Sequence, residues 1–254
     1  MRLAGKAGVV TGGSRGLGLE AVRAALAEGA KVVATSRSGH ADVSVNSSIL
    51  SKELLEMRGD VRVEADVVAA IDACWTTFGG FDFIVNNAGI LGEGRLHETT
   101  NEQWNDLVST HLTGTFWGCK HALLDMRAHG TGGAIVNVGS ILSFTGDGYL
   151  AAYTGMKAGV LGLTKAIAVD YAADGIRCNC VCPGDMDTPM IQQYFAGTEA
   201  PDQARAEMLA AYPGKRIADA REVANAVVFL LSDESSFVNG TSIVVDGGLL
   251  AKTY

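Results

Sequence analysis

The sequence predicts an α/β fold in which helices flank a doubly wound parallel sheet. Short apolar runs alternate along the chain with longer amphipathic runs, which is the pattern of repeated strand-helix units. A glycine-rich turn joins the first apolar run to the first helical run. Small and polar residues follow several apolar runs, as expected where parallel strands end beside a ligand. With 254 residues, 48% of them hydrophobic, the chain fits a single domain over residues 1–254.

Composition excludes some classes of partner. The formal net charge of -8 argues against nucleic acid, which would require a basic face. There is no apolar stretch of about 18 residues, and the segment from Met1 to Lys6 lacks the apolar core of a signal peptide. We therefore expect a cytoplasmic protein without a membrane partner.

The chain has five cysteines, an odd number that does not suggest a disulfide framework. Cys178, Cys180 and Cys182 alternate, so on a strand they share one face. Alternation spaces side chains along a line instead of converging them on an ion. We expect buried apolar packing here and no metal site.

The predicted elements follow from hydrophobic periodicity. Seven strands with right-handed crossovers are predicted at residues 7–11, 31–35, 61–65, 81–85, 134–138, 176–182 and 241–245. Helices are predicted at residues 19–28, 49–57, 68–78, 101–129, 152–172 and 222–231. The polar stretch 38–48 is predicted to be a loop.

Three residues could perform chemistry together. Tyr153 and Lys157 are four apart, so on a helix they stand one turn apart on the same face. An ammonium beside a phenol favours the phenolate and would lower the pKa of Tyr153 from about 10. Ser140 follows a predicted strand and offers a hydroxyl to the same substrate oxygen. The same spacing also occurs in solvated or packing pairs on ordinary helices.

The glycine-rich turn predicts a phosphate-binding site. It reads Thr-Gly-x-x-x-Gly-x-Gly from Thr11 to Gly18 and lies between a strand and a helix. Glycines there allow the backbone to approach a pyrophosphate, while the helix N-terminus supplies free N–H groups and a positive dipole.

These two motifs, together with Asn-Asn-Ala-Gly after the fourth predicted strand and Pro-Gly after the sixth, resemble the short-chain dehydrogenase/reductase family. The resemblance covers essentially the whole chain. It implies a Rossmann-type fold and an oxidoreductase that transfers a hydride between a nicotinamide cofactor and a carbonyl or secondary alcohol. It also implies that Tyr153 is the general acid or base, that Lys157 lowers its pKa and holds the nicotinamide ribose, and that Ser140 positions the carbonyl oxygen.

The resemblance also implies a set of cofactor-binding positions. In the family, the Asp of an Asp-Val pair after the third strand binds adenine, and Asp66 and Val67 match it; Asp66 could equally be a helix N-cap. The family's Pro-Gly and the Thr after it hold the nicotinamide carboxamide, although Pro-Gly is also an ordinary turn. The positions are Gly12, Ser14, Arg15, Gly16, Leu17, Gly18, Ser36, Arg37, Asp66, Val67, Asn87, Ala88, Gly89, Tyr153, Lys157, Pro183, Gly184, Met186 and Thr188.

Cofactor preference depends on the end of the second strand. A site selective for NAD places a carboxylate there to bind the ribose 2'-hydroxyl and repel a 2'-phosphate. This chain has Ser36 followed by Arg37, with Arg15 as a second phosphate partner. The missing carboxylate favours NADP(H) over NAD(H). Alternatively, both arginines are merely exposed and the protein is an NAD-dependent secondary-alcohol dehydrogenase.

His111 is a departure from the family, which places an Asn here whose backbone binds a water on the path to the catalytic lysine. Three interpretations remain open for the histidine. It could support that water, it could join the proton relay because it titrates near pH 6.5, or it could be a packed side chain.

Residues 186–212 interrupt the strand-helix alternation and are predicted to form a substrate lid. Substrate contacts could come from Met190, Tyr194, Phe195 and Met208, and Ile141, Leu142 and Phe144 suggest a mostly apolar pocket. The family resemblance implies a homotetramer or homodimer. A rival of another class is a non-catalytic dinucleotide-binding protein, which the intact Ser140, Tyr153 and Lys157 disfavour.

Overall fold

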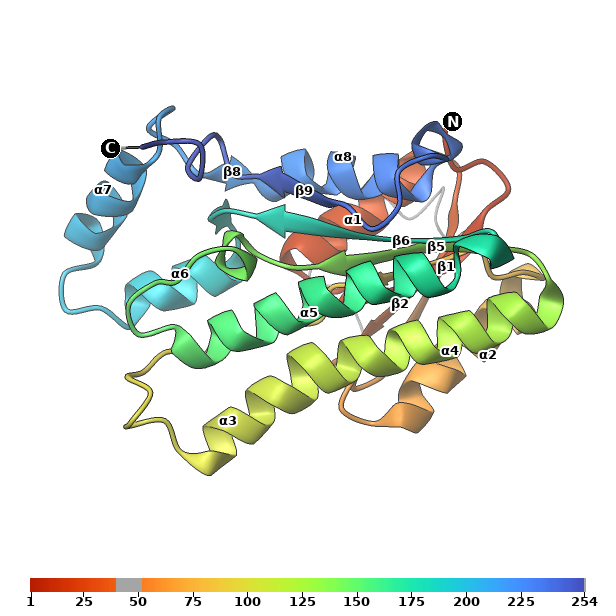
Figure 1. Ribbon diagram of the computed structural model, residues 1–254, viewed down its shortest axis with the longest axis horizontal. Coiled ribbons are helices and arrows are strands. Elements are labelled where there is room, and N and C mark those ends of the chain that lie inside the picture. The colour runs from red at the N-terminus through yellow and green to blue at the C-terminus, as the bar shows by residue number, and fades with distance from the viewer. Residues whose placement is uncertain (40–51, 254) are drawn as a thin grey trace.

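A computed structural model describes residues 1–39 and 52–253 and shows one central sheet (Figure 1). Its seven strands are all parallel and lie in the order β3-β2-β1-β4-β5-β6-β9. The strands are β1 (Ala7–Thr11), β2 (Lys31–Ser36), β3 (Leu54–Arg58), β4 (Phe83–Asn86), β5 (Gly133–Val138), β6 (Ile176–Pro183) and β9 (Ser242–Val245). The order reverses direction between β1 and β4, so a crevice opens where these two strands end.

Helices cover both faces of the sheet (Figure 1). One face carries α1 (Gly16–Ala27) and α8 (Ala220–Leu231), and the other carries α2 (Glu64–Phe78), α4 (Gly114–His129) and α5 (Ala151–Asp170). The predicted doubly wound Rossmann-type fold is confirmed. Within the described residues, none of these helices combines the length and apolar character needed to cross a bilayer.

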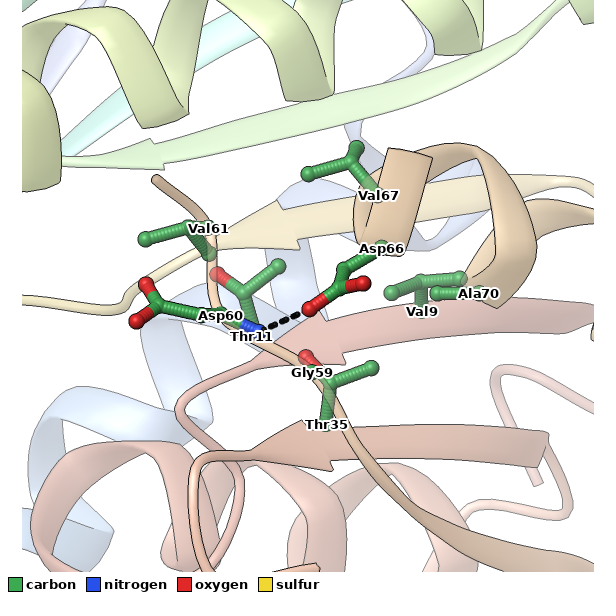
Figure 2. Close-up of a pocket in the computed structure, with 9 residues that line it drawn as sticks. All are labelled: Val9, Thr11, Thr35, Gly59, Asp60, Val61, Asp66, Val67 and Ala70. Atoms are coloured by element: carbon green, nitrogen blue, oxygen red, sulfur yellow. Dashed lines mark hydrogen bonds between the residues drawn. The ribbon is translucent and has the colours of Figure 1, made fainter. Parts of the chain in front are cut away.

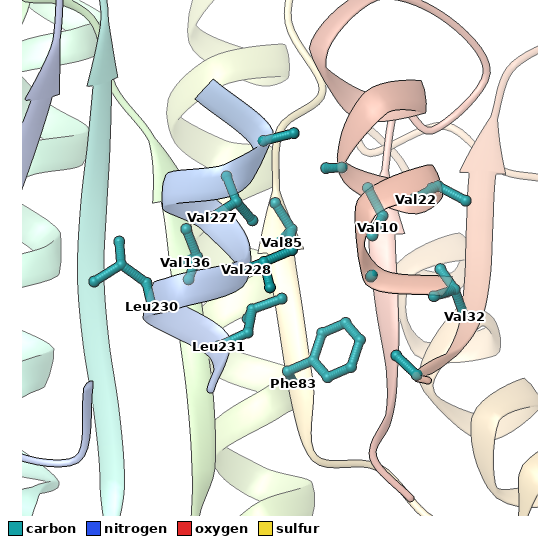
Figure 3. Close-up of a cluster of buried hydrophobic side chains, with 14 of the residues drawn as sticks. Val10, Val22, Val32, Phe83, Val85, Val136, Val227, Val228, Leu230 and Leu231 are labelled. Carbon is teal, nitrogen blue, oxygen red and sulfur yellow. The ribbon is translucent and has the colours of Figure 1, made fainter. Parts of the chain in front are cut away.

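The core on the α1 and α8 face explains why these segments fold as they do. Val227, Val228 and Leu231 of α8 point onto the sheet, against Phe83 and Val85 of β4 (Figure 3). All five residues of β1 are buried, as expected for a central strand covered on both faces.

The third strand was predicted in the wrong place. The prediction assigned a helix to residues 49–57 and a strand to 61–65, but β3 is Leu54–Arg58 and Val63 is the N-cap of α2. Residues 49–51, and 40–48 of the predicted loop, lie outside the described residues. β3 is an edge strand and is only partly buried. It carries the charged residues Glu56 and Arg58, so its mixture of apolar and charged residues resembles the pattern of an amphipathic helix.

The helix predicted over 101–129 has three parts. It begins as α3 (Asn101–Leu107), where Thr100 and Gln103 form a capping box. A π-helical segment, η1 (Val108–Thr113), follows and continues into α4. Such π segments often accompany functional sites, and this one contains His111.

The region predicted as a lid contains two helices, α6 (Pro189–Ala196) and α7 (Pro201–Ala211). They lie at the end of the sheet toward which β6 points (Figure 1). The short strands β7 (Met186–Asp187) and β8 (Ala218–Asp219) pair in parallel and close the base of this segment.

Candidate active site

The predicted catalytic residues come together where β5 ends and α5 begins. Ser140 follows β5 directly, and Tyr153 and Lys157 lie on the first turns of α5. The chain turns at Ser140, whose hydroxyl accepts a hydrogen bond from the amide of Leu142 at 3.1 Å. The hydroxyl of Ser143 donates to the carbonyl of Lys157 at 2.9 Å, so this turn is bound to α5.

Lys157 is held inside the protein. Its side chain is 5% exposed, and Nζ donates a hydrogen bond to the carbonyl oxygen of Val138 at 2.8 Å. The same nitrogen lies 5.5 Å from the centre of the Tyr153 ring. Burial lowers the pKa of Lys157 to about 8, because removal from water disfavours the ammonium form.

The pKa of Tyr153 differs from the expectation. Burial raises it above the ordinary value of 10, and the hydrogen bond with Ser140 acts in the opposite direction. The structure does not support the predicted lowering by Lys157, because the ammonium is directed to the Val138 carbonyl. The phenol therefore stays protonated and is suited to donate a proton to a substrate oxygen.

His111 is buried and fixed by the backbone of Ile90. Its Nε2 lies 2.8 Å from the carbonyl oxygen of Ile90 and 3.2 Å from the amide nitrogen of the same residue. With the shorter contact assigned as a donor, Nδ1 is an acceptor, and it has no hydrogen-bond partner among the described residues. The ring meets Tyr153 edge-on, with centroids 5.2 Å apart.

The charge state of His111 follows from its surroundings. Burial is the main cause that lowers its pKa to about 3, and the positive charge of Lys157 lowers it further. The imidazole is therefore neutral at physiological pH. This argues against the interpretation in which it carries a proton through the relay near neutral pH.

The glycine turn has the form that a pyrophosphate needs. Gly12 and Gly16 have φ of +67° and +54°, which only glycine adopts without strain. A Cβ at Gly12 would lie 3.0 Å from the Cα of Ala88, and one at Gly18 would collide with the carbonyl of Gly12. The N-cap of α1 is Arg15, whose side chain does not cap the helix, so the first N–H groups of α1 remain available to an anion.

The predicted residues after β4 support this turn. The side-chain Nδ2 of Asn87 donates to the carbonyl of Thr11 at 2.9 Å, and the backbone N–H of Ala88 donates to the Thr11 hydroxyl at 3.1 Å. A Cβ at Gly89 would lie 2.8 Å from Cε1 of His111. Thus the Asn-Ala-Gly segment joins the glycine turn to the catalytic end of the site.

The predicted adenine residues do not follow the third strand, because β3 ends earlier than expected. Asp66 and Val67 lie inside α2, and the Asp66 carboxylate accepts a hydrogen bond from the backbone N–H of Asp60 at 2.8 Å (Figure 2). Another Asp-Val pair, Asp60 and Val61, follows β3 directly and was missed. All four residues line one pocket beside the ends of β1 and β2 (Figure 2).

The end of β2 is exposed and basic. Ser36 accepts a hydrogen bond from the amide of Gly39 at 3.1 Å, while Arg37 and Arg15 are exposed. Arg62 is the main cause that lowers the pKa of Asp60, by hydrogen bonding, and Arg37 adds a smaller effect. The positive charge of Arg37 therefore lies close to this pocket.

The segment that follows β6 lies against the glycine turn. Thr188 is buried beside the glycine turn, 3.6 Å from the position that a Cβ of Gly16 would take. Pro183 is the last residue of β6, Gly184 follows it, and Met186 is partly buried. The glycine turn therefore lies next to both the segment after β4 and the segment after β6. Cysteines 178, 180 and 182 are buried on one face of β6.

These features fit a nicotinamide dinucleotide. The glycine turn leaves room that a Cβ would fill, α1 presents free N–H groups, and Nδ1 of His111 is a buried acceptor without a partner among the described residues. The protein thus has the crevice of a dinucleotide-binding enzyme, with an acid-base group at one end.

Comparisons with known proteins place the chain more closely. Residues 12–250 match a family model described as enoyl-(acyl carrier protein) reductase. The chain is 41% identical to 2-(R)-hydroxypropyl-CoM dehydrogenase of Xanthobacter autotrophicus, over 96% of this chain and 98% of that one. It is 42% identical to cis-4-hydroxycyclohexanecarboxylate dehydrogenase of Sinomonas cyclohexanicum, over 96% of each. The crystal structure of levodione reductase superposes with a TM-score of 0.92 at 35% identity, covering 100% of both chains.

The chain therefore belongs to the short-chain dehydrogenase/reductase family. It is an oxidoreductase that acts on alcohol or carbonyl groups with a nicotinamide cofactor.

Proposed function

We propose that this enzyme transfers a hydride reversibly between NADP(H) and the carbonyl or secondary alcohol of a small, mostly apolar substrate. The observation that carries the proposal is the grouping of Ser140 and Tyr153, both partly buried, with the buried Lys157 where β5 ends and α5 begins. When bound, the cofactor supplies or accepts the hydride.

The protein's own residues handle the proton and the substrate oxygen. Tyr153 donates its phenolic proton as a ketone is reduced and recovers one when an alcohol is oxidised. Ser140 donates a second hydrogen bond to the same oxygen and so fixes the carbonyl. Lys157 keeps two of its three N–H donors after bonding to Val138, and these are available to the nicotinamide ribose.

His111 is proposed as a positioning residue. Its bond to Ile90 fixes the loop beside the crevice and holds the π segment against Tyr153. Its Nδ1 is an acceptor suited to a water beside Lys157, in accordance with the water-supporting interpretation.

For the cofactor, Ser36 supplies no negative charge at the end of β2, and Arg37 and Arg15 are exposed cations on either side of that point. We assign them to the 2'-phosphate of NADP(H). Asp60 and Val61 replace Asp66 and Val67 as the adenine contacts, because Asp60 follows the strand while Asp66 supports its backbone. The remaining predicted positions keep their proposed roles.

The substrate pocket lies between the turn after Ser140 and the segment 186–212, which we propose acts as a lid. Ile141 and Leu142 form the short 3-10 helix beside Ser140, and Phe144, just after it, is exposed. On the lid, Met190 is exposed and Tyr194 partly buried, whereas Phe195 is buried under Arg205. We therefore assign substrate contact to Met190, Tyr194 and Met208 before Phe195.

We further propose a cytoplasmic homotetramer or homodimer. The outer faces of α4 and α5 carry exposed Phe116, Leu124 and Val169, which a second copy of the chain would cover.

A second candidate is an NAD-dependent alcohol dehydrogenase of the same fold. It is favoured by two relatives whose names describe dehydrogenases of hydroxyl compounds. The non-catalytic alternative is disfavoured because Ser140, Tyr153 and Lys157 are not only present but packed together.

The test is a parallel fluorescence titration with NADPH and NADH, followed by assays of ketone reduction and alcohol oxidation. We expect NADPH to bind at least about tenfold tighter, a difference of about 1.4 kcal/mol. Equal or tighter binding of NADH would select the second candidate. Binding of a cofactor without turnover of any carbonyl or alcohol would contradict the proposed reaction.

A further inference from the structure

We propose that the carboxylate of Asp185 determines substrate specificity: it accepts a hydrogen bond from a hydroxyl or ammonium group of the substrate and repels substrates that carry an anion. This inference rests on the proposed function, because it concerns the substrate side of the same site. Asp185 was not among the residues predicted from the sequence.

The carboxylate of Asp185 is held in place by Tyr212. The hydroxyl of Tyr212 donates a hydrogen bond to Oδ2 of Asp185 at 2.9 Å and accepts one from the Asp185 backbone N–H. Tyr212 is 2% exposed and packs against Gly184, where a Cβ would lie 2.7 Å from its hydroxyl. The carbonyl of Asp185 also accepts from the amide of Ala218 at 3.0 Å. These contacts fix both the backbone and one carboxylate oxygen.

The other oxygen, Oδ1, accepts no hydrogen bond from the described residues. Asp185 immediately follows the Pro183-Gly184 turn, so it lies at the end of β6, next to the strand that delivers Ser140. Because β5 and β6 are parallel, Asp185 lies at the same edge of the sheet as Ser140, and its negative charge is among the causes that raise the pKa of Tyr153. Oδ1 is therefore an acceptor without a partner among the described residues, at the edge of the sheet where Ser140 lies.

Other charges at this mouth have the same sign. Glu93, Asp147, Asp185 and Glu207 all raise the pKa of Tyr194, after the larger effect of burial. They come from four separate segments, so the negative charge that acts on Tyr194 does not belong to one element.

Two arginines that are close in sequence to Glu93 and Glu207 contact aromatic rings. Among the described residues, Arg95 stacks on Tyr149 at 5.5 Å and Arg205 on Phe195 at 5.9 Å. Neither forms an ion pair with these four carboxylates within that part of the chain. The four carboxylates would therefore disfavour an anionic substrate, while a donor group would find Oδ1 ready to accept.

The experiment compares four cyclohexanones that differ only in the substituent on carbon 4. They are 4-methylcyclohexanone, 4-(hydroxymethyl)cyclohexanone, 4-(dimethylaminomethyl)cyclohexanone and 4-oxocyclohexanecarboxylate. We expect kcat/KM for the hydroxymethyl or the ammonium ketone to exceed that for the carboxylate at least about tenfold. The two donor ketones distinguish hydroxyl from ammonium recognition. Asp185→Asn should reduce this ratio about tenfold, and Tyr212→Phe should reduce it less, because the carboxylate remains but loses its support.

The matched control is Asp170→Asn, which removes the same charge from an exposed position at the far end of α5, 17 residues beyond Tyr153 and about 25 Å away along the helix axis. Its selectivity should equal that of the wild type. Equal use of the carboxylate and donor ketones by the wild type, or an unchanged ratio in Asp185→Asn, would overturn the proposal.

Binding to the Tyr153→Phe protein gives the same comparison without turnover. The quenching of bound NADPH or NADH fluorescence by each ketone yields four dissociation constants. Failure to reduce any ketone while this order of affinities holds would contradict the proposed reaction but not the role of Asp185. Equal affinities, or no binding of the donor ketones, would contradict the role itself.

Discussion

The two ends of the crevice are built by opposite means. At the catalytic end, Lys157 and His111 are buried and each is held by a backbone carbonyl, of Val138 and Ile90 respectively. At the adenine end, Arg15 and Arg37 are exposed, and the pairing of Asp60 with Arg62 at 2.7 Å lies at the surface.

This comparison shows that charges are perturbed most strongly where the side chains that carry them are buried. Burial lowers the pKa of Lys157 to about 8 and that of His111 to about 3, because water no longer stabilises their charges. Exposed pairs at the other end are screened and contribute little each. We therefore expect large effects from catalytic-end substitutions and modest ones from the adenine end.

The largest effect is expected for Tyr153→Phe. It removes the hydroxyl to which we assign proton transfer to the substrate oxygen and should lower kcat about a thousandfold, roughly 4 kcal/mol of barrier. Cofactor affinity should change less than about threefold, since the ring remains. Stopped-flow turnover and fluorescence titration measure the two quantities.

Tyr149→Phe serves as the control, because Tyr149 is an exposed tyrosine in the loop before α5. It should keep most of the wild-type activity. Substantial residual turnover in Tyr153→Phe would remove the acid-base role from this residue.

Next is a pH effect on stability at Lys157. Its folded pKa of about 8 lies below the unfolded value of 10.5, so between these values the unfolded chain holds a proton that the folded protein has released. Mass action then makes the wild type more stable, relative to Lys157→Met, as pH rises from 8 to 10.5. The gain is on the order of 3 kcal/mol at most.

Urea unfolding at pH 7.5 and 9.5 measures this difference, with Lys165→Met on the exposed side of α5 as the control. A difference between wild type and Lys157→Met that stays constant with pH would show that Lys157 is not desolvated.

His111 should produce a somewhat smaller change in folding stability, at acidic pH. Its folded pKa of about 3 lies below the unfolded value of 6.5, so the stability of the neutral, buried imidazole is present above pH 6.5 and is lost as pH falls below it. At pH 5 the wild type should lose about 2 kcal/mol relative to His111→Asn.

Unfolding at pH 7 and pH 5 tests this, with His97→Asn as an exposed control. His111→Asn should also keep kcat within about tenfold, because an amide can still bond Ile90. A large loss together with a shifted pH-rate profile would show that the imidazole itself takes part in proton transfer.

The same contrast explains what the sequence predicted well. Ser140, Tyr153 and Lys157 stand on a central strand and a long helix, whose periodicity is strong, so their convergence followed from spacing and family resemblance. The edge strand β3 has no such pattern, since charges occupy its outer positions. Because the strand was expected further along the chain, the prediction assigned the adenine contact to Asp66, whereas we propose Asp60.

Contacts between distant residues were beyond sequence reasoning. Tyr212 lies 27 residues from Asp185, and no local pattern predicts that its hydroxyl fixes that carboxylate. Likewise the bond of His111 to Ile90 depends on the π segment, which hydrophobic periodicity does not distinguish from an ordinary helix.

The smallest expected effect tests the exposed end directly. Ser36→Asp places a carboxylate at the end of β2, where it would bind a ribose 2'-hydroxyl and repel a 2'-phosphate. We expect NADPH to bind about tenfold more weakly and NADH to bind as well or better, a shift of about 1.4 kcal/mol. The weakening of NADPH binding should shrink at high salt, because exposed charges are screened.

Two further variants test the same site. Arg37→Ala should lower the affinity for NADPH alone, and Arg221→Ala on the exposed surface of α8 should change the affinity for neither cofactor. If Ser36→Asp leaves both affinities unchanged, the 2'-position of the ribose does not lie beside β2. The exposed charges that bind the cofactor would then have to be sought at another place along the crevice.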